Sequence, residues 1–268
     1  MQFTVVLGVD DAHVEHLKLV LPTWAKHKPS LLEQQFVLFY DRDMKLGRVS
    51  SFLEQYAKNV RYQIWPPEEI KYEGFETYFR GGNVKWFKPQ RNKMLSGFVH
   101  VPAMTVQTLY WLKLDLDVVA TGKNDWVDEE WFSNNKPAIV SHPWGYTKPP
   151  GQMCELDLWF REKVIPKFPT LGMTKPLNLL PEPGSSLVKH KRIISWCAFF
   201  NTEFTRLCSD LCSETVGVYK LPVPSQDGVM WYLAKRLNYD IVTTNMKSRG
   251  WDHQSRITGI KKAVKGVM

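Results

Sequence analysis

Tyr110-Trp111-Leu112-Lys113-Leu114-Asp115-Leu116-Asp117 is an apolar run that ends at two aspartates, one residue apart. Its aromatic and aliphatic side chains predict a β-strand over Gln107–Leu114, so both carboxylates follow directly after a strand. In an open α/β sheet, ligands bind where the strands end. A hard divalent cation takes oxygen ligands, commonly one or two carboxylates together with substrate phosphates. Aspartates are also common after strands, so the pair by itself is a weak indication of a metal site.

The residues before this run alternate between short β-rich segments and helical patterns. Strands are expected at Phe3–Val9, Gln35–Tyr40 and Val60–Trp65, and helices at about Val14–Lys26 and Leu46–Lys58. The strand segments are almost continuously apolar, which is typical of strands that are buried on both faces. The alternation therefore predicts right-handed crossovers and an α/β fold, with a mostly parallel sheet flanked by helices.

The pattern after Trp65 is less regular. A Pro/Gly-rich loop over residues 66–88 leads to a helix that is expected to begin near Pro89 and to end before Pro102. A second long loop is expected over Pro166–Pro183, which contains five prolines. The remaining expected elements are strands at Pro137–Ser141, Arg192–Phe200 and about Asp240–Thr243, and helices at about Glu203–Cys212 and Gln226–Leu237.

Composition restricts the class of protein. The chain has 268 residues, of which 44% are hydrophobic, so it is long enough for one large domain with a sizeable core. No apolar run approaches the roughly 20 residues that a transmembrane helix needs, and we expect a cytoplasmic protein with four reduced structural cysteines. The net charge of +8 predicts attraction to polyanions such as sugar nucleotides, nucleic acid or an anionic membrane surface. Residues 247–268 form a basic C-terminal extension, for which a solvated tail is the plain structural alternative.

The segment from Tyr110 to Val119 resembles the Asp-x-Asp segment of GT-A glycosyltransferases, and the order of elements is similar over most of the chain. The resemblance implies a Rossmann-like, single-domain GT-A fold over residues 1–246. It places a nucleotide-sugar-binding half at about 1–120 and an acceptor half at about 121–246, with 247–268 contributing to the metal and donor site. The implied activity is transfer of a hexosyl or pentosyl group from a nucleotide sugar, with a UDP-sugar as the first choice.

The resemblance also implies which residues hold the metal and the donor. Asp115 and Asp117 would bind Mn²⁺ or Mg²⁺, and Arg249-Gly250-Trp251-Asp252-His253 is similar to the C-terminal segment whose His completes the metal shell. Imidazole suits Mn²⁺ better than Mg²⁺. The implied donor contacts are Val9, Asp10, Asp41, Arg91, Lys93 and Asp115. For Arg91 and Lys93 a solvated helix face is the alternative, and for His253 a surface histidine.

A third set of residues concerns the acceptor. Pro224-Ser225-Gln226-Asp227-Gly228 resembles the acidic pair that supplies the catalytic base of inverting enzymes, but Gln226 replaces the first acid. Only Asp227 is then left as the base, and a helix cap is its structural alternative. Trp196 lies in a strand similar to the one that closes the sugar pocket. Trp144 and Tyr146 offer a stacking platform, or else pack within a loop.

The acceptor itself is not determined by the sequence. A glycan or lipid-linked sugar is the first reading, and DNA carrying a hydroxymethylated pyrimidine is the second, since the basic extension would follow phosphates. A non-catalytic nucleic-acid-binding module and a metal-dependent nucleotidyltransferase are further alternatives. No phosphate-loop, zincin or serine-hydrolase motif is present.

Overall fold

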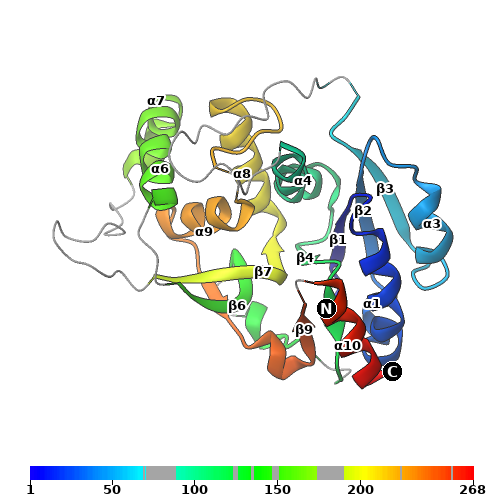
Figure 1. Ribbon diagram of the computed structural model, residues 1–268. Coiled ribbons are helices and arrows are strands. Elements are labelled where there is room, and N and C mark those ends of the chain that lie inside the picture. The colour runs from blue at the N-terminus through cyan, green and yellow to red at the C-terminus, as the bar shows by residue number, and fades with distance from the viewer. Residues whose placement is uncertain are drawn as a thin grey trace.

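A seven-stranded mixed sheet forms the centre of the computed structural model (Figure 1). The structure describes residues 1–68, 70, 89–122, 126–133, 136–146, 151–173, 190–223, 225–254 and 256–268. The strands of the sheet are β1 (Thr4–Val9), β2 (Gln35–Asp41), β3 (Val60–Trp65), β4 (Tyr110–Leu114), β6 (Ile139–Tyr146), β7 (His190–Asn201) and β8 (Ile241–Thr243). Their order across the sheet is β3-β2-β1-β4-β7-β6-β8. A separate two-stranded sheet joins β5 (Val118–Ala120) to β9 (Trp251–His253).

The strand directions agree with the expected α/β fold. β3, β2, β1 and β4 run parallel to one another, whereas β7 is antiparallel to both of its neighbours, β4 and β6. β8 returns to the parallel direction beside β6. The sheet is therefore mostly parallel, and the carboxyl ends of β1, β2 and β4 lie at one edge.

Two layers of helices cover the sheet. The helices and helical turns are α1 (Val14–His27), α2 (Pro29–Leu32), α3 (Gly47–Leu53), α4 (Pro89–Thr105), α5 (Glu130–Ser133), α6 (Gly151–Trp159), η2 (Phe160–Val164), α7 (Ile165–Lys167), η3 (Pro169–Met173), α8 (Thr202–Thr215), α9 (Gln226–Arg236), η4 (Met246–Arg249) and α10 (Ile257–Val267). α1, α3 and α10 pack on one face, and α4, α8 and α9 on the other (Figure 1). Alternation along the strands explains the two layers, because Val5 and Leu7 face the first layer and Val6 faces the second.

Several predicted boundaries were wrong. α4 does not stop before Pro102 but continues to Thr105, and Val99 and Val101 on this part of the helix are fully buried. Burial of that face outweighs the hydrogen bond that a proline cannot donate inside a helix. α3 ends at Leu53, earlier than expected. Helical turns occupy Ile165–Lys167 and Pro169–Met173 within the predicted loop, whose remainder lies outside the described residues.

The basic C-terminal extension contains a packed helix. Ile260 of α10 is fully buried against the core, and Ala263, Val264 and Val267 pack beside it. The opposite face of α10 exposes Lys261, Lys262 and Lys265. Lys26 and His27 at the end of α1 bond the carbonyl oxygens of the last two residues. The extension is thus part of the fold on one side and solvated on the other.

The cysteines and the hydropathy of the helices can be compared with the sequence-based expectations. Cys197, Cys208 and Cys212 are buried and free, whereas the side chain of Cys154 lies outside the described structure. Within the described ranges, no helix is both long and apolar enough to span a bilayer.

Candidate functional site

Two aspartates and one histidine meet where β4 ends. The ligand atoms of Asp115, Asp117 and His253 all lie within 4.8 Å of one another. Asp115 follows β4 and Asp117 precedes β5, which pairs antiparallel with β9 so that Val118 lies opposite His253. The backbone N–H of Gln254 donates to the carbonyl oxygen of Asp117 over 3.0 Å. The small β5–β9 sheet therefore brings the C-terminal histidine to the central aspartates.

Gly250 makes this approach of β9 possible. Its φ of +80° lies in the left-handed region, and a Cβ added there would be 1.8 Å from the carbonyl oxygen of Gly122. Only glycine tolerates both conditions. Its own carbonyl oxygen accepts from the N–H of Thr121 over 2.8 Å, which continues the pairing between β5 and β9.

The donor atoms at this position suit a divalent cation. Oδ1 of Asp117 is buried and has no hydrogen-bond partner among the described residues, and Oδ2 lies 3.4 Å from Nε2 of His253. A buried oxygen without a partner is costly in a folded protein, and a cation would satisfy it. Burial opposes protonation of His253, but the hydrogen bond to Asp117 and the charges of Asp117 and Asp115 outweigh it and raise the pKa. Two carboxylates and an imidazole fit Mn²⁺.

Trp196 of β7 contacts both His253 and Asp115. Its ring stacks on His253 with centroids 5.8 Å apart and an interplanar angle of 17°. Its carbonyl oxygen accepts from the N–H of Asp115 over 2.8 Å. The side chain of Trp196 is only 3% exposed, and the centroid of the His142 ring lies 5.7 Å from the centroid of its own ring. In this position Trp196 orients the candidate metal residues.

Asp227 belongs to α9, which packs on the same face of the sheet as α4 and α8, and its carboxylate is close enough to Asp115 for their charges to interact. Ser195 holds its carboxylate, since Oγ donates to Oδ1 and the backbone N–H lies 3.4 Å from Oδ2. The N-cap of α9 is Ser225, whose Oγ accepts from the N–H of Gly228 over 3.1 Å, so Asp227 is not the helix cap. Burial raises the pKa of Asp227 above its usual value, against the opposing effects of Lys113 and Ser195, and Asp115 adds to the increase.

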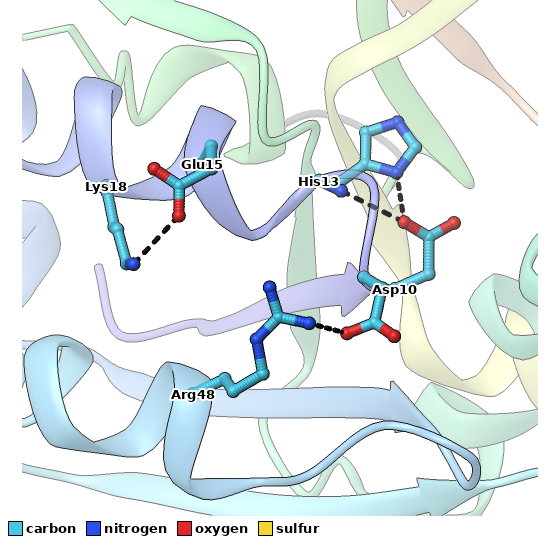
Figure 2. Close-up of polar contacts among 6 residues, drawn as sticks. Asp10, His13, Glu15, Lys18 and Arg48 are labelled. Atoms are coloured by element: carbon cyan, nitrogen blue, oxygen red, sulfur yellow. Dashed lines mark hydrogen bonds and ion pairs between the residues drawn. The ribbon is translucent and has the colours of Figure 1, made fainter.

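Asp10 and His13 lie at the end of β1, next to β4 in the sheet. Nδ1 of His13 is 2.5 Å from Oδ1 of Asp10, which also accepts the His13 N–H over 3.1 Å (Figure 2). The hydrogen bond to Asp10 raises the pKa of His13 against the effect of burial, and the charges of Asp10, Asp117 and Asp115 act in the same direction. The neighbouring aspartate, Asp11, forms an ion pair with Arg48 of α3. His13 thus belongs to the electrostatic surroundings of Asp115 and Asp117.

The other residues predicted to contact the donor differ in which of their groups a bound nucleotide sugar could reach. Val9 is fully buried, so only its backbone is available. Asp41 and Lys93 form a buried ion pair of 2.6 Å at the end of β2. The side chains of Arg91, Trp144 and Tyr146 lie outside the described structure, although their backbones belong to α4 and β6.

Sequence reasoning missed three contributors to the site. Lys113 bonds Asp115, Ser195 bonds Asp227 and His13 bonds Asp10. A charged residue inside an otherwise apolar strand was a usable signal for Lys113. The role of Ser195 depends on the pairing of β7 with β4, which no local pattern indicates.

Comparison with known proteins agrees with this architecture. No protein-family model and no curated protein sequence matches the chain. Among solved structures, core-mannan synthase A (CmsA/Ktr4) from Aspergillus fumigatus, in its Mn/GDP form, has a TM-score of 0.58 at 13% identity, over 87% of this chain and 69% of that one. The mannosyltransferase Ktr4p from S. cerevisiae in complex with GDP has a TM-score of 0.61 at 10% identity, over 94% and 71%. The chain therefore has the fold of GT-A glycosyltransferases, and an Asp-x-Asp pair stands at the end of its central strand.

Proposed function

We propose that this protein is a metal-dependent glycosyltransferase that moves a hexosyl or pentosyl group from a nucleotide sugar to an acceptor hydroxyl. One observation carries the proposal: the ligand atoms of Asp115, Asp117 and His253 gather within 4.8 Å at the end of β4 in a GT-A fold. The buried Oδ1 of Asp117, which no described residue satisfies with a hydrogen bond, supports a cation there. The mixed ligand set favours Mn²⁺ over Mg²⁺, and a structurally similar synthase is described in a Mn/GDP form.

The donor binds along the carboxyl ends of β1, β2 and β4. Asp10 and the backbone of Val9 line the first of these ends, and the ion pair of Asp41 and Lys93 the second. Arg91 of α4 is a further contact by its place in the sequence. A UDP-sugar was the expected donor, but both similar structures carry GDP, so GDP-sugars have equal standing.

Asp227 is the proposed base. It removes the proton of the acceptor hydroxyl as that oxygen attacks the anomeric carbon, in a single displacement that inverts the configuration. Its raised pKa brings a carboxylate closer to the range in which it takes up a proton usefully. A bound cation would neutralise charge on the departing nucleoside diphosphate. Ser195 keeps Asp227 oriented.

The proposed acceptor is a glycan or lipid-linked sugar. β6 and β7 form the side of the site opposite β1, and Trp144, Tyr146 and Trp196 belong to these strands. Aromatic rings offer apolar faces for sugars, so Trp144 and Tyr146 are the proposed acceptor contacts by their place in the sequence. Trp196 is 3% exposed and stacks on His253, so it holds the metal residues rather than presenting a face to the acceptor.

DNA with a hydroxymethylated pyrimidine is the second candidate acceptor. α10 exposes Lys261, Lys262 and Lys265 on one face, and Arg256 just before it is also exposed. Such a face attracts phosphates or an anionic membrane surface, and its contribution weakens as salt rises.

A donor screen tests the proposal. The purified chain is incubated with labelled UDP- and GDP-sugars with and without Mn²⁺, and hydrolysis is measured for the native protein and for Asp115→Asn/Asp117→Asn. Asp252→Asn, a neighbouring acid outside the ligand set, is the matched control. We expect Mn²⁺-dependent hydrolysis that only the double variant loses. Hydrolysis that the double variant retains would exclude this site.

The same reactions then receive oligosaccharide or hydroxymethylated DNA as acceptors. Label in the glycan supports the first acceptor, and label in DNA, lost at high salt, the second. DNA binding without sugar hydrolysis would indicate a non-catalytic binding module instead, and transfer of the nucleotide would indicate a nucleotidyltransferase.

A further inference from the structure

Lys113 is a charged residue in the centre of the sheet. β4 lies between β1 and β7, and Leu112 and Leu114 on either side of Lys113 pack into the core on the α1 face. Lys113 points to the other face, where its Nζ lies 4.5 Å from the centroid of the Phe98 ring of α4. Its side chain is 3% exposed. An ammonium group in this position is costly unless specific partners compensate for lost water.

The partners of this ammonium group belong to the candidate active site. Nζ of Lys113 forms an ion pair with Oδ1 of Asp115, and it donates to the carbonyl oxygen of Ser195 over 3.0 Å. Asp115 comes directly after β4 and two residues after Lys113, so the alternation along the strand brings it to the same side as the lysine. The buried ammonium group of Lys113 is therefore already paired with one carboxylate oxygen of Asp115, a candidate metal ligand.

The second partner extends this link to the proposed base. Ser195 accepts from Lys113 through its carbonyl oxygen and donates to Asp227 through its hydroxyl group. One residue of β7 thus connects the lysine of β4 with the acid at the start of α9. Two acids are thereby linked to one buried lysine, Asp115 directly and Asp227 through Ser195.

We propose that Lys113 is a positioning residue, a resident counter-cation that fixes Asp115 and Asp227 before the metal and the donor arrive and that competes with the metal for Asp115. The proposal rests on the function proposed above. Two cations beside one carboxylate repel each other, and the repulsion is strong where water is excluded. The native site accordingly holds its metal less tightly than the same site with an uncharged side chain at position 113.

This competition distinguishes the proposal from a purely structural role. Lys113→Met removes the charge at similar length. We expect it to bind Mn²⁺ about tenfold more tightly than the native protein, because repulsion is removed. Donor hydrolysis falls in kcat by about tenfold or more, because Asp115 and Asp227 lose their common partner, and KM for the donor changes less than kcat. A structural defect would weaken metal binding and activity together.

Electron paramagnetic resonance of free Mn²⁺ measures the affinity in the full chain, and circular dichroism checks the fold. Lys113→Gln is the second variant, since its amide still donates to Ser195, and the same direction is expected. Lys28→Met is the matched control: Lys28 is also fully buried, donates to the carbonyl oxygen of Arg249 and lies 5.4 Å from the Trp251 ring. It should lose thermal stability and gain no Mn²⁺ affinity, because it holds the carbonyl oxygens of Gly122 and Arg249 beside β5 and β9 and does not bond Asp115. Tighter Mn²⁺ binding is therefore expected only when the charge at position 113 is removed.

Folded Lys113→Met or Lys113→Gln protein with unchanged or weaker Mn²⁺ binding would overturn the role of Lys113 alone. Native protein that binds no Mn²⁺, or binding that Asp115→Asn/Asp117→Asn leaves intact, would instead overturn the proposed function. The two failures are therefore separate.

Discussion

Asp227 is held by Ser195 within a buried part of the site, close to Asp115 and Lys113. Burial favours the neutral acid, so its pKa is raised, and the nearby ammonium group limits that increase. A base must be deprotonated to accept the proton of an acceptor. The activity of the enzyme should therefore depend on the ionisation of this one residue.

We predict that kcat/KM for sugar transfer rises with pH through the pKa of Asp227, with its acidic limb above the ordinary value of 3.8. Asp227→Asn should lower transfer by about 10²–10⁴-fold while nucleotide and Mn²⁺ binding persist. Steady-state rates from pH 4 to 9 and titration calorimetry provide the two readouts. Native turnover in Asp227→Asn would eliminate this residue as the base.

At the scale of the elements, His100 connects α4 with α8 and the chain that follows it. Its Nδ1 lies 2.9 Å from Oγ of Ser209, and its Nε2 lies 3.2 Å from the carbonyl oxygen of Lys220. The ring stacks on Trp65 and is completely buried. Burial lowers the pKa of His100 to about 4. The native packing of these helices therefore requires a neutral ring.

Because the folded pKa lies below the unfolded value of 6.5, His100 supports stability above pH 6.5 and withdraws that support as the pH falls toward 4. The loss of unfolding free energy attributable to this group approaches about 3 kcal/mol. Urea unfolding at pH 7.0 and 4.5 measures it. His100→Gln, which cannot be protonated, should lose less stability over this range. An equal loss in both proteins would contradict the prediction.

Elements whose structure is determined by their own residues could be predicted from the sequence, whereas elements that depend on contacts with distant residues could not. β1 and β2 are short, largely apolar runs, and β3 combines β-branched and aromatic residues with Arg61 and Gln63. All three strands appear within about one residue of their predicted bounds. The end of α4 was missed because burial of Val101 and its neighbours overrides the local effect of Pro102. β5 and β9 have three residues each and are strands only through their mutual pairing.

At the scale of the whole molecule, α10 closes the end of the fold that carries the candidate metal residues. It packs on α1 and on β5, the strand that follows Asp117 (Figure 1). A helix with one apolar and one basic face was not recognised from the sequence, where the charges suggested a tail. Its apolar face is buried only when α10 packs against α1 and β5, which are distant from it in the sequence.

Ile260→Ala should lower the free energy of unfolding by about 2–4 kcal/mol, because the side chain is fully buried. Mn²⁺ affinity should also fall, since α10 supports β5. Ile257→Ala is the matched control on the same helix: this side chain is 37% exposed, and the cost should stay below about 1 kcal/mol. Denaturant unfolding compares the two. Equal costs would mean that α10 is not docked as described.

The site was predictable to the extent that its residues are adjacent in sequence. Asp115 and Asp117 follow from the strand that they end, and resemblance to a family proposed His253 for the same cation. Its approach to the aspartates depends on Gly250 and on the pairing of β9 with β5. The bond between Lys113 and Ser195 joins β4 to β7, and sequence periodicity contains no information about that pair.

We expect a divalent cation to bind at the end of β4, between Asp115, Asp117 and His253. Crystals grown with Mn²⁺ and GDP or UDP should show its position when diffraction is measured at the manganese absorption edge. One anomalous peak is expected in contact with these three residues, with the diphosphate against it. Nucleotide bound in the crystal with manganese held by other residues, or with none at this position, would mean that the three residues do not form the metal site.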